Sequence, residues 1–499
     1  MQDRWTEPAE PAEAAEQENS LRHSLHLVTV AWVFGAVWLY ISTGAALTRY
    51  AQLLHLPKFG FGLLAALPFA GALMQLPTSL FIERFGRHKA IFITAGIIHR
   101  ALWAAIALVP WLLPAAWGWP AFLVLFFVTG AVGHMSTPIW ISWMADLVPA
   151  RLRGRYFSRR IQIGQFVGLF VTLFMGMILD RAGHVGASAM LLTISVLFGI
   201  SAVCGVVDFS FFTGVQPPAA HTMTPELSLW RMIRQPLADR NFRRFVGFTA
   251  TLTFATGYVG QFVWLYLFDV AKMTNTHATT LLVVIPLMIT LLSYPMWGRL
   301  IDRLGRKPVL VVAGILIIHG GAAWIFVTPE HWIPGYIAVV VATIAWPGVD
   351  LANFNILLGI SEPTRGARRY GSAYVAVNSL VVAVAGILSG LFAGVIAQWL
   401  GDWKGSLFGW PLTYHGVLLL ISAALRLAAL LWLFGLEDKH ALRTREALGY
   451  MGVEMYSTLQ QAVFMPGRLL LRLGRWTYKL NPRSFADRAR RLGRHEQDP

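Results

Sequence analysis

The sequence of 499 residues has a single cysteine and few charged side chains. Cys204 has no second cysteine to pair with, which excludes an intramolecular disulfide and any metal or redox motif built on paired cysteines. Charged residues make up 13% of the chain, against about 25% in an average soluble protein, while hydrophobic residues make up 56%. The apolar residues occur in runs of about 20, the length that crosses a ~30 Å hydrocarbon core. Composition therefore indicates a membrane protein.

Enzyme signatures are also missing. The sequence contains no H-E-x-x-H zinc motif, no G-x-S-x-G nucleophile elbow and no second deep carboxylate to partner Asp350. No Walker A motif is present, so ATP is not the obvious energy source. We therefore expect a protein that is not an enzyme and that needs no cofactor or metal.

The N-terminus lacks the basic region of a secretory signal peptide. Its first 20 residues are acidic, with carboxylates from Asp3 to Glu18. We expect residues 1–24 to form a short disordered acidic tail.

Twelve apolar segments follow that tail. Helices are the practical interpretation, because lipid cannot satisfy an open backbone and a β-barrel would show alternation instead. The expected fold is an all-α polytopic membrane protein with twelve transmembrane helices. Their expected ranges are Leu25 to Leu47, Phe61 to Phe81, Ala90 to Leu112, Trp119 to Trp143, Ile161 to Leu179, Ala187 to Phe209, Phe245 to Phe268, Thr279 to Leu300, Val309 to Val327, Trp332 to Leu358, Ala373 to Leu400 and Leu412 to Leu436.

The net charge of +16 is distributed in a way that argues against nucleic-acid binding. Lys and Arg gather in alternate loops, such as Arg151 to Arg160 and Arg299 to Lys307, whereas the intervening loops hold only Arg49, Lys58, Arg181, Lys272 and Lys404. By the positive-inside rule the rich loops are cytoplasmic, and an even number of spans then places both termini inside.

The chain divides into two similar halves. The longest internal connection, residues 214–244, is rich in proline and separates an N-terminal six-helix bundle (25–213) from a C-terminal one (245–436). Pro149-x-Arg151-x3-Arg155-Tyr156 after the fourth segment is repeated as Pro363-x-Arg365-x3-Arg369-Tyr370 after the tenth. Internal repeats of this kind are typical of secondary transporters.

A second repeated loop carries the family resemblance. Gly298-Arg299-Leu300-Ile301-Asp302-Arg303-Leu304-Gly305-Arg306-Lys307 resembles the G-x-L-x-D-R-x-G-R-K signature of the major facilitator superfamily, and the first half has a degraded copy with Glu83, Gly86 and Arg87. The resemblance covers about residues 25–436. It implies two pseudo-symmetric six-helix bundles that rock around a midplane site.

The repeated loop has two possible roles. Asp302, Gly305 and Arg306, with their first-half counterparts, are candidates for a conformational latch, because glycine allows a tight turn and a carboxylate can pair with nearby basic groups. The alternative is that these arginines only enforce topology.

Asp350 is the sharpest candidate for a substrate or proton-coupling site, since ionisable residues inside spans are costly and mark function by default. The resemblance implies that the first, fourth, seventh and tenth spans line a central cavity, and the tenth carries Asp350 with Asn353 one turn away. Structural pairing is the alternative for Asp350, and packing of small residues is the alternative for the seventh span. Further candidates on the cavity spans are Tyr40, His134, Gln261 and Trp264.

The expected function is a secondary active transporter that moves a small molecule by alternating access, coupled to protons because one buried carboxylate can carry a proton alone. We expect a monomer in the cell (inner) membrane. The alternative is a non-transporting assembly factor or receptor on the same fold. The substrate stays open, since neither the G-P-x-x-G-G drug-antiporter motif nor the P-E-S-P-R sugar-porter motif is present.

The C-terminal tail, residues 437–499, mixes basic and apolar residues around Arg468 to Trp476. This pattern suits an interfacial helix on anionic membrane lipid, with a solvated tail as the alternative.

Overall fold

The structure is a computed structural model that describes residues 11–75, 77–78, 88–149, 152–217, 229–361, 371–438 and 450. The described part of the first half is helical. Its elements are α1 (Pro11–Ile41), α2 (Gly44–Leu53), α3 (Lys58–Ala72), α5 (His88–Leu112), α6 (Ala115–Leu147), α7 (Arg153–Val185), α8 (Ala187–Ser210) and the 3-10 turn η2 (Phe211–Gly214).

The second half repeats this helical character and adds one hairpin. Its helices are α9 (Leu229–Ala238), α10 (Arg240–Gly257), α11 (Gly260–Asp269), α12 (Asn275–Thr279), η3 (Thr280–Val284), α13 (Ile285–Leu304), α14 (Arg306–Ala322), η4 (Ala323–Phe326), α15 (Ile333–Ser361), α16 (Gly371–Leu400) and α17 (Tyr414–Leu431). Strands β1 (Lys404–Leu407) and β2 (Trp410–Thr413) pair antiparallel, with Lys404 opposite Thr413. The sequence did not predict this hairpin.

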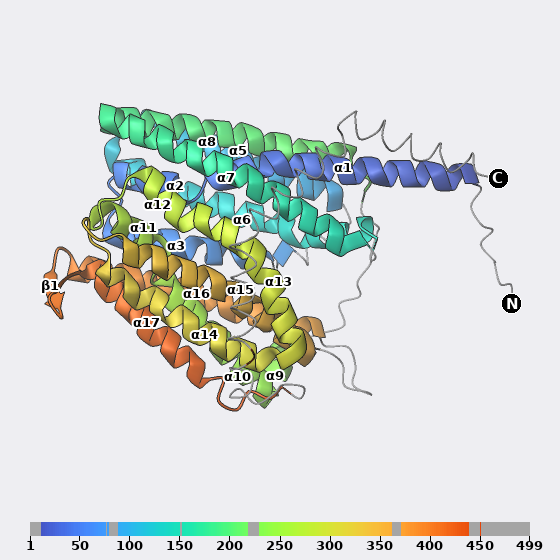
Figure 1. The fold of residues 1–499 in the computed structure, drawn as a ribbon. Coiled ribbons are helices and arrows are strands. Elements are labelled where there is room, and N and C mark those ends of the chain that lie inside the picture. Colours follow the sequence, from blue (N-terminus) through green and yellow to red (C-terminus); the bar gives the residue numbers. More distant parts are fainter. Residues whose placement is uncertain are drawn as a thin grey trace, which may run out of the picture.

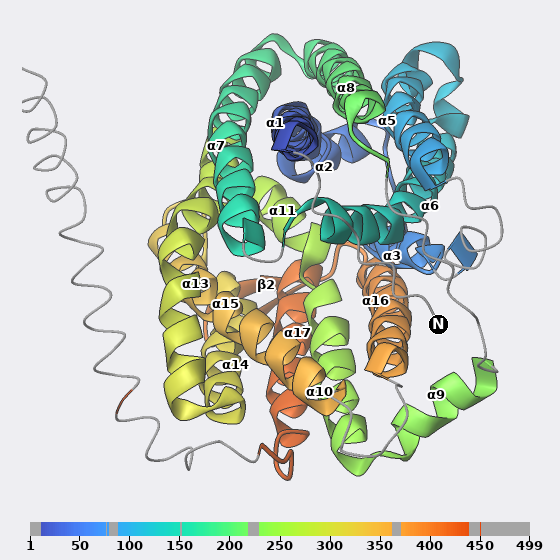
Figure 2. The same cartoon turned by 90° about the vertical axis from the view of Figure 1, so that its right-hand side faces the viewer.

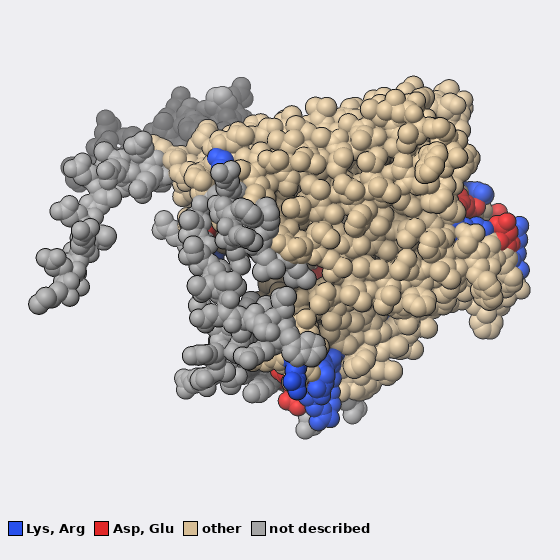
Figure 3. Space-filling model, turned by 180° about the vertical axis from the view of Figure 1, so that it is seen from behind, with Lys and Arg blue, Asp and Glu red and all other residues tan. Residues whose placement is uncertain are grey.

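The described residues include ten helices that are long and apolar enough to cross a membrane. On the face shown in Figure 3, Lys, Arg, Asp and Glu gather mainly at the two ends of the molecule, and most of the visible surface between them carries no charge. A chain with this many spans and a largely uncharged belt is an integral multi-pass membrane protein, as its composition predicted. The expected all-α polytopic fold is therefore confirmed.

The two remaining expected spans are built differently. The segment 61–81 begins in the shorter apolar helix α3 and continues into residues that are not described. The segment 245–268 is split at Tyr258 and Val259, between Gly257, which ends α10, and Gly260, which begins α11. Hydropathy alone predicts one continuous helix there, because it does not register a local change of helix direction.

The start of the chain also differs from expectation. Helix α1 begins at Pro11, so residues 11–24, expected to be disordered, are helical. The segment expected to run unbroken from Leu25 to Leu47 is interrupted after Ile41. Thr43 is extended, and Gly44 has a φ of +67°, a conformation that glycine adopts most readily.

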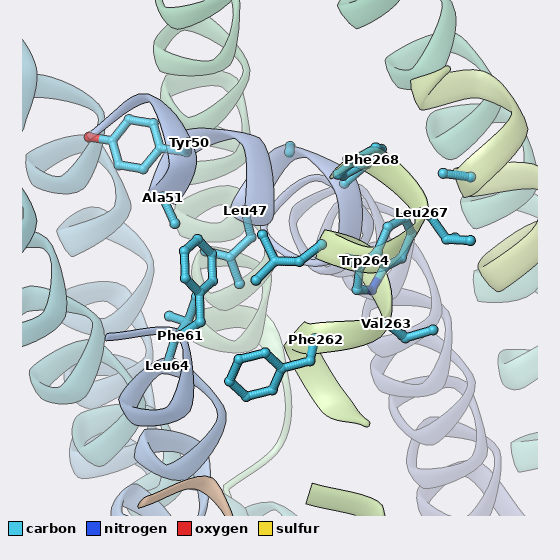
Figure 4. Close-up of a cluster of buried hydrophobic side chains, with 14 of the residues drawn as sticks. Leu47, Tyr50, Ala51, Phe61, Leu64, Phe262, Val263, Trp264, Leu267 and Phe268 are labelled. Carbon is cyan, nitrogen blue, oxygen red and sulfur yellow. The ribbon is translucent and has the colours of Figure 1, made fainter. Parts of the chain in front are cut away.

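The two halves meet at one end of the molecule and diverge toward the other. In Figure 1, α1 and α5 to α8 lie above α10 and α13 to α17, and α2, α3, α11 and α12 lie between them at the end that also carries β1. Figure 2 looks at the opposite end, where α1 and α7 stand apart from α10 and α14. Figure 4 shows the buried cluster at the meeting point, to which Phe61 and Leu64 of α3 and Phe262, Trp264 and Phe268 of α11 belong.

Candidate functional site

Polar contacts join the two halves at their closed end. Arg49 Nε donates to Asn275 Oδ1 at 3.0 Å, and Gln52 Nε2 donates to Asp269 Oδ1 at 2.9 Å. Lys58 Nζ pairs with Asp402 Oδ1 at 2.7 Å. Lys58 holds the pKa of the exposed Asp402 carboxyl below its usual range, chiefly through this hydrogen bond. Arg49 and Lys58 belong to the loops that are poor in positive charge, so the closed end is the one that the positive-inside rule places outside.

Asp180 of α7 accepts four hydrogen bonds from the second half. One carboxylate oxygen accepts from the backbone N–H of Asn275 at 2.6 Å and from its side-chain amide at 2.9 Å. The other accepts from the backbone N–H of Thr276 at 3.0 Å and from its hydroxyl at 2.6 Å. An anion on the free N–H groups of a helix start is favoured by charge and by hydrogen bonding. Asp180 thus ties the first half to the start of α12 in the second.

Closely packed glycines join the halves along α3 and α16. A Cβ atom on Gly62 would collide with the backbone of Gly390 and Gly394, and a Cβ on Gly390 would lie 2.8 Å from Ala66. Residues this small let two helix backbones touch, which is how helices gain packing energy inside a membrane. The interface between the halves is thus polar at the closed end, and along this helix pair the backbones touch at Gly62, Gly390 and Gly394, while the Phe69 ring packs on Gly386.

A cavity of about 280 Å³ in the second half contains Asp350 and Asn353. Asp350 is exposed to this space and accepts a hydrogen bond from the Tyr294 hydroxyl at 3.4 Å. The side-chain oxygen of Asn353 is buried and has no hydrogen-bond partner among the described residues. Thr253 and Thr256 of α10 line the same cavity. The structure therefore brings together the tenth-span candidates and two threonines of the seventh.

His134 and Gln261 line a second cavity of about 370 Å³ where the halves face each other. The amide of Gln75 lies 3.1 Å from His134 Nδ1. Thr48 donates to Gln261 Oε1 at 3.2 Å, so Gln261 contacts the opposite half directly. These two candidates are close to each other but line a different cavity from Asp350.

Trp264 and Tyr40 have other surroundings. Trp264 is 9% exposed and belongs to the buried cluster at the closed end (Figure 4). A Cβ atom on Gly44 would lie 3.0 Å from its ring. The Tyr40 ring lies against Gly168 of α7, where a Cβ atom would not fit. Both positions indicate packing roles in this conformation of the protein.

The second copy of the repeated loop forms the turn between α13 and α14. Asp302 is exposed near the end of α13, and Gly305 follows with a φ of +96°. The backbone N–H groups of Arg306 and Lys307 donate to Asp438 at 2.9 and 3.0 Å, so a carboxylate beyond the last span caps α14. The first copy, with Glu83, Gly86 and Arg87, lies outside the described residues.

The sequence analysis missed a buried ion pair in the first half. Asp350 was taken as the only acid deep in a span, but Asp208 near the end of α8 is 7% exposed and lies 3.3 Å from Arg100 of α5. The Arg100 guanidinium also stacks 3.3 Å above the Trp38 ring. The sequence does contain a clue to this pair, because Arg100 and Asp208 both fall inside apolar segments of the first half.

These features define a class of protein: a polytopic membrane protein whose two halves enclose polar cavities. The sequence model of the Major Facilitator Superfamily matches residues 27–390. The chain therefore belongs to this superfamily of membrane transporters, as the repeated loop predicted. Among curated protein sequences, no significant match was found.

Solved transporter structures share the fold at low sequence identity. The nucleoside transporter NupG is 14% identical, with a TM-score of 0.60 over 84% of this chain and 99% of its own. A bacterial homolog of the human lysosomal transporter Spinster, inward-facing and unoccupied, is 16% identical, with a TM-score of 0.58 over 88% and 98%. The xylose transporter XylE from E. coli, partially occluded and inward open, is 14% identical, with a TM-score of 0.57 over 85% and 100%.

Proposed function

We propose that this protein is a secondary active transporter that moves a small solute by alternating access, driven by protons. One observation carries the proposal: polar contacts between the halves close one end, above cavities that contain Asp350, His134 and Gln261. Hydrogen-bonded contacts of this kind can be exchanged for contacts with water when the closed end opens. Two helix bundles that meet in this way are suited to rocking about a midplane site.

In the proposed orientation both termini are cytoplasmic and the closed end faces outward across the cell (inner) membrane. The arginine asymmetry of the loops supports this orientation. The similar folds of the inward-facing Spinster homolog and the inward-open XylE support an inward-facing state. A cysteine at position 58 should react with an impermeant reagent outside intact cells, and one at 365, which lies outside the described residues, should not. The reverse pattern would reject the orientation.

Proton coupling is proposed at Asp350. The carboxylate opens on a cavity, so a proton can reach it, and a proton crossing the membrane gains about 2.3 kcal/mol per 100 mV. The folds of a D-xylose-proton symporter and of the E. coli fucose:proton symporter, with TM-scores of 0.57 and 0.52, are consistent with this energy source. The latch role of Asp302, Gly305 and Arg306, the monomeric state and the anionic lipid at residues 437–499 stay predictions.

Flux in proteoliposomes tests the function. Purified protein is reconstituted with an imposed inward or outward proton gradient, and uptake is measured for a panel of labelled sugars, nucleosides and organic anions. We expect at least one solute to accumulate against its gradient, and accumulation to collapse with a protonophore. Binding without flux of any bound solute would favour the alternative, a receptor or assembly factor on this fold.

A further inference from the structure

A third cavity, of about 330 Å³, lies within the first half and contains the buried ion pair. Its walls come from five helices. The lining residues used below are Trp32 and Trp38 of α1, Arg100 of α5, Ser136 and Trp140 of α6, Arg160 of α7 and Asp208 of α8. Neither the proton site at Asp350 nor the cavity of His134 and Gln261 uses the charged residues of this group.

The cavity has more positive than negative charge. Arg100 is compensated by Asp208 at 3.3 Å. In the described part of the chain Arg160 has no carboxylate within ion-pair distance, and its charged group instead lies 4.3 Å from the Trp32 ring centre and 5.0 Å from that of Trp140. The two rings hold Arg160 in place without neutralising its charge.

The unpartnered polar atoms of this cavity are hydrogen-bond donors. Trp38 Nε1, Arg100 Nε and Arg160 Nε are buried without an acceptor in the described residues, and each of these N–H groups can only donate. The Ser136 hydroxyl is buried without a partner as well. Buried donors are costly when unsatisfied, so several of them around one cavity indicate a ligand that supplies acceptor oxygens.

We infer that this cavity binds an organic anion, whose carboxylate or phosphate lies between Arg160 and Ser136 and whose apolar part packs on Trp32 and Trp140. Arg160 supplies the charge, Ser136 a donor, and the tryptophan rings the apolar surface. A planar guanidinium suits both oxyanions because it can donate two parallel hydrogen bonds. As an assignment of the transported solute, this inference rests on the proposed function and gives it a substrate class.

Equilibrium binding to the purified protein in neutral detergent tests the inference separately from transport. The probes are benzoate and phenyl phosphate, with benzylamine and benzyl alcohol as cationic and neutral controls of the same size. We expect the two anions to bind at least tenfold more tightly than either control. Equal binding of benzylamine or benzyl alcohol would overturn the inference.

Two arginine variants on one helix locate the site. Arg160→Gln should weaken anion binding about tenfold or more, because it removes the uncompensated charge and its donors. Arg155→Gln changes the same charge at an exposed position of α7 and should bind anions as the unaltered protein does. If Arg160→Gln folds poorly, Ser136→Ala provides the second measurement, with an expected loss of a few fold. Unchanged binding by the folded variants would reject the site.

The anionic group could belong to a free solute or to a lipid headgroup, and nanodiscs separate these sources. In phosphatidylcholine discs phenyl phosphate should bind. If anionic phosphatidylglycerol discs abolish this binding in the protein with Arg160 intact, the occupant is a lipid headgroup; if binding persists, it is a free solute. Anion binding without flux would leave this site standing and reject the transporter, whereas flux without anion binding would do the opposite.

Discussion

The carboxylate of Asp350 opens on a cavity, and this position determines what its charge costs. A charged acid at the centre of a lipid-facing helix costs about 2.5 to 3.5 kcal/mol on insertion scales. Exposure to the cavity and the hydrogen bond from Tyr294 at 3.4 Å reduce that penalty. The proposed coupling requires protonation and release at this position, and its test is a variant that cannot titrate.

Asp350→Asn keeps the side-chain shape and removes the titrating group. We expect the variant to lose accumulation driven by a proton gradient while it retains exchange of solute down its own gradient. Both are measured as labelled uptake in proteoliposomes, with reconstituted protein quantified in each preparation. Full accumulation by the variant would leave Asp350 a structural role, and parallel loss of both modes would indicate that it pairs directly with the solute.

Sequence reasoning identified Asp350 and Asn353 because both lie at helical spacing inside one long apolar run, and the structure places them in one cavity. Asp208 was missed because it stands near the end of its run, where a charge is usually taken as a boundary residue. Only the fold shows that the last turns of α8 pack against the middle of α5 and against Gly35 of α1, so that Asp208 is buried beside Arg100. Pairings between helices cannot be read from spacing within one helix.

At the scale of the element, hydropathy predicted most of the long helices and failed at their interruptions. The break between α1 and α2 lies at Gly44, which has a positive φ. Gly44 also contacts the ring of Trp264, a residue of the other half of the protein. The break between α10 and α11 lies at another close contact, here within the second half, because a Cβ on Gly257 would meet Ser389 of α16. Apolar composition is continuous across both breaks.

Gly44→Ala should destabilise the protein. Its Cβ would lie 3.0 Å from the Trp264 ring in a backbone conformation that alanine rarely adopts, at a cost of about 1 to 3 kcal/mol. We expect the apparent melting temperature in detergent to fall by a few degrees. Gly199→Ala, in the middle of α8 with nothing within 4 Å of its Cβ position, is the matched control and should leave the temperature unchanged or raise it. Equal effects would show that the strain at Gly44 is not significant.

For the whole molecule, the proposed alternating access requires the contacts at the closed end to break and re-form. Asp180→Asn should loosen that end, because the amide cannot accept all four hydrogen bonds that the carboxylate receives from Asn275 and Thr276. Hydrogen bonds to a charged group contribute about 1.5 to 3 kcal/mol, so their partial loss should raise outer opening about tenfold.

Thiol labelling measures this opening. A cysteine at the buried position Thr48, in a background without Cys204, should react with an impermeant reagent about tenfold faster when Asp180→Asn is added. Arg181→Gln, at the exposed position next along α7, should leave the rate unchanged. A rate insensitive to Asp180→Asn would mean that this carboxylate does not hold the outer end closed.

The Lys58 and Asp402 pair should not act as an acid switch. Since the pKa of Asp402 is lowered in the folded protein, its contribution is present at neutral pH and is lost only as the pH falls through that lowered value. Acidification from about pH 7 to about pH 5 stays above this range. Acidification should therefore change the labelling rate at position 48 by the same factor in the protein with Asp402 and in the Asp402→Asn variant. A pH response that disappears in Asp402→Asn would contradict this.

The glycine contact of α3 and α16 has a mechanical consequence. Gly62, Gly390 and Gly394 leave no side chain between the two backbones at this point, whereas Phe69 of α3 packs on Gly386 of α16. In the proposed transport cycle this glycine contact serves as the pivot about which the two halves rotate. In the proposed alternating access, rotation of the two halves about this contact would separate Lys58 from Asp402 and Asp180 from α12 at the closed end.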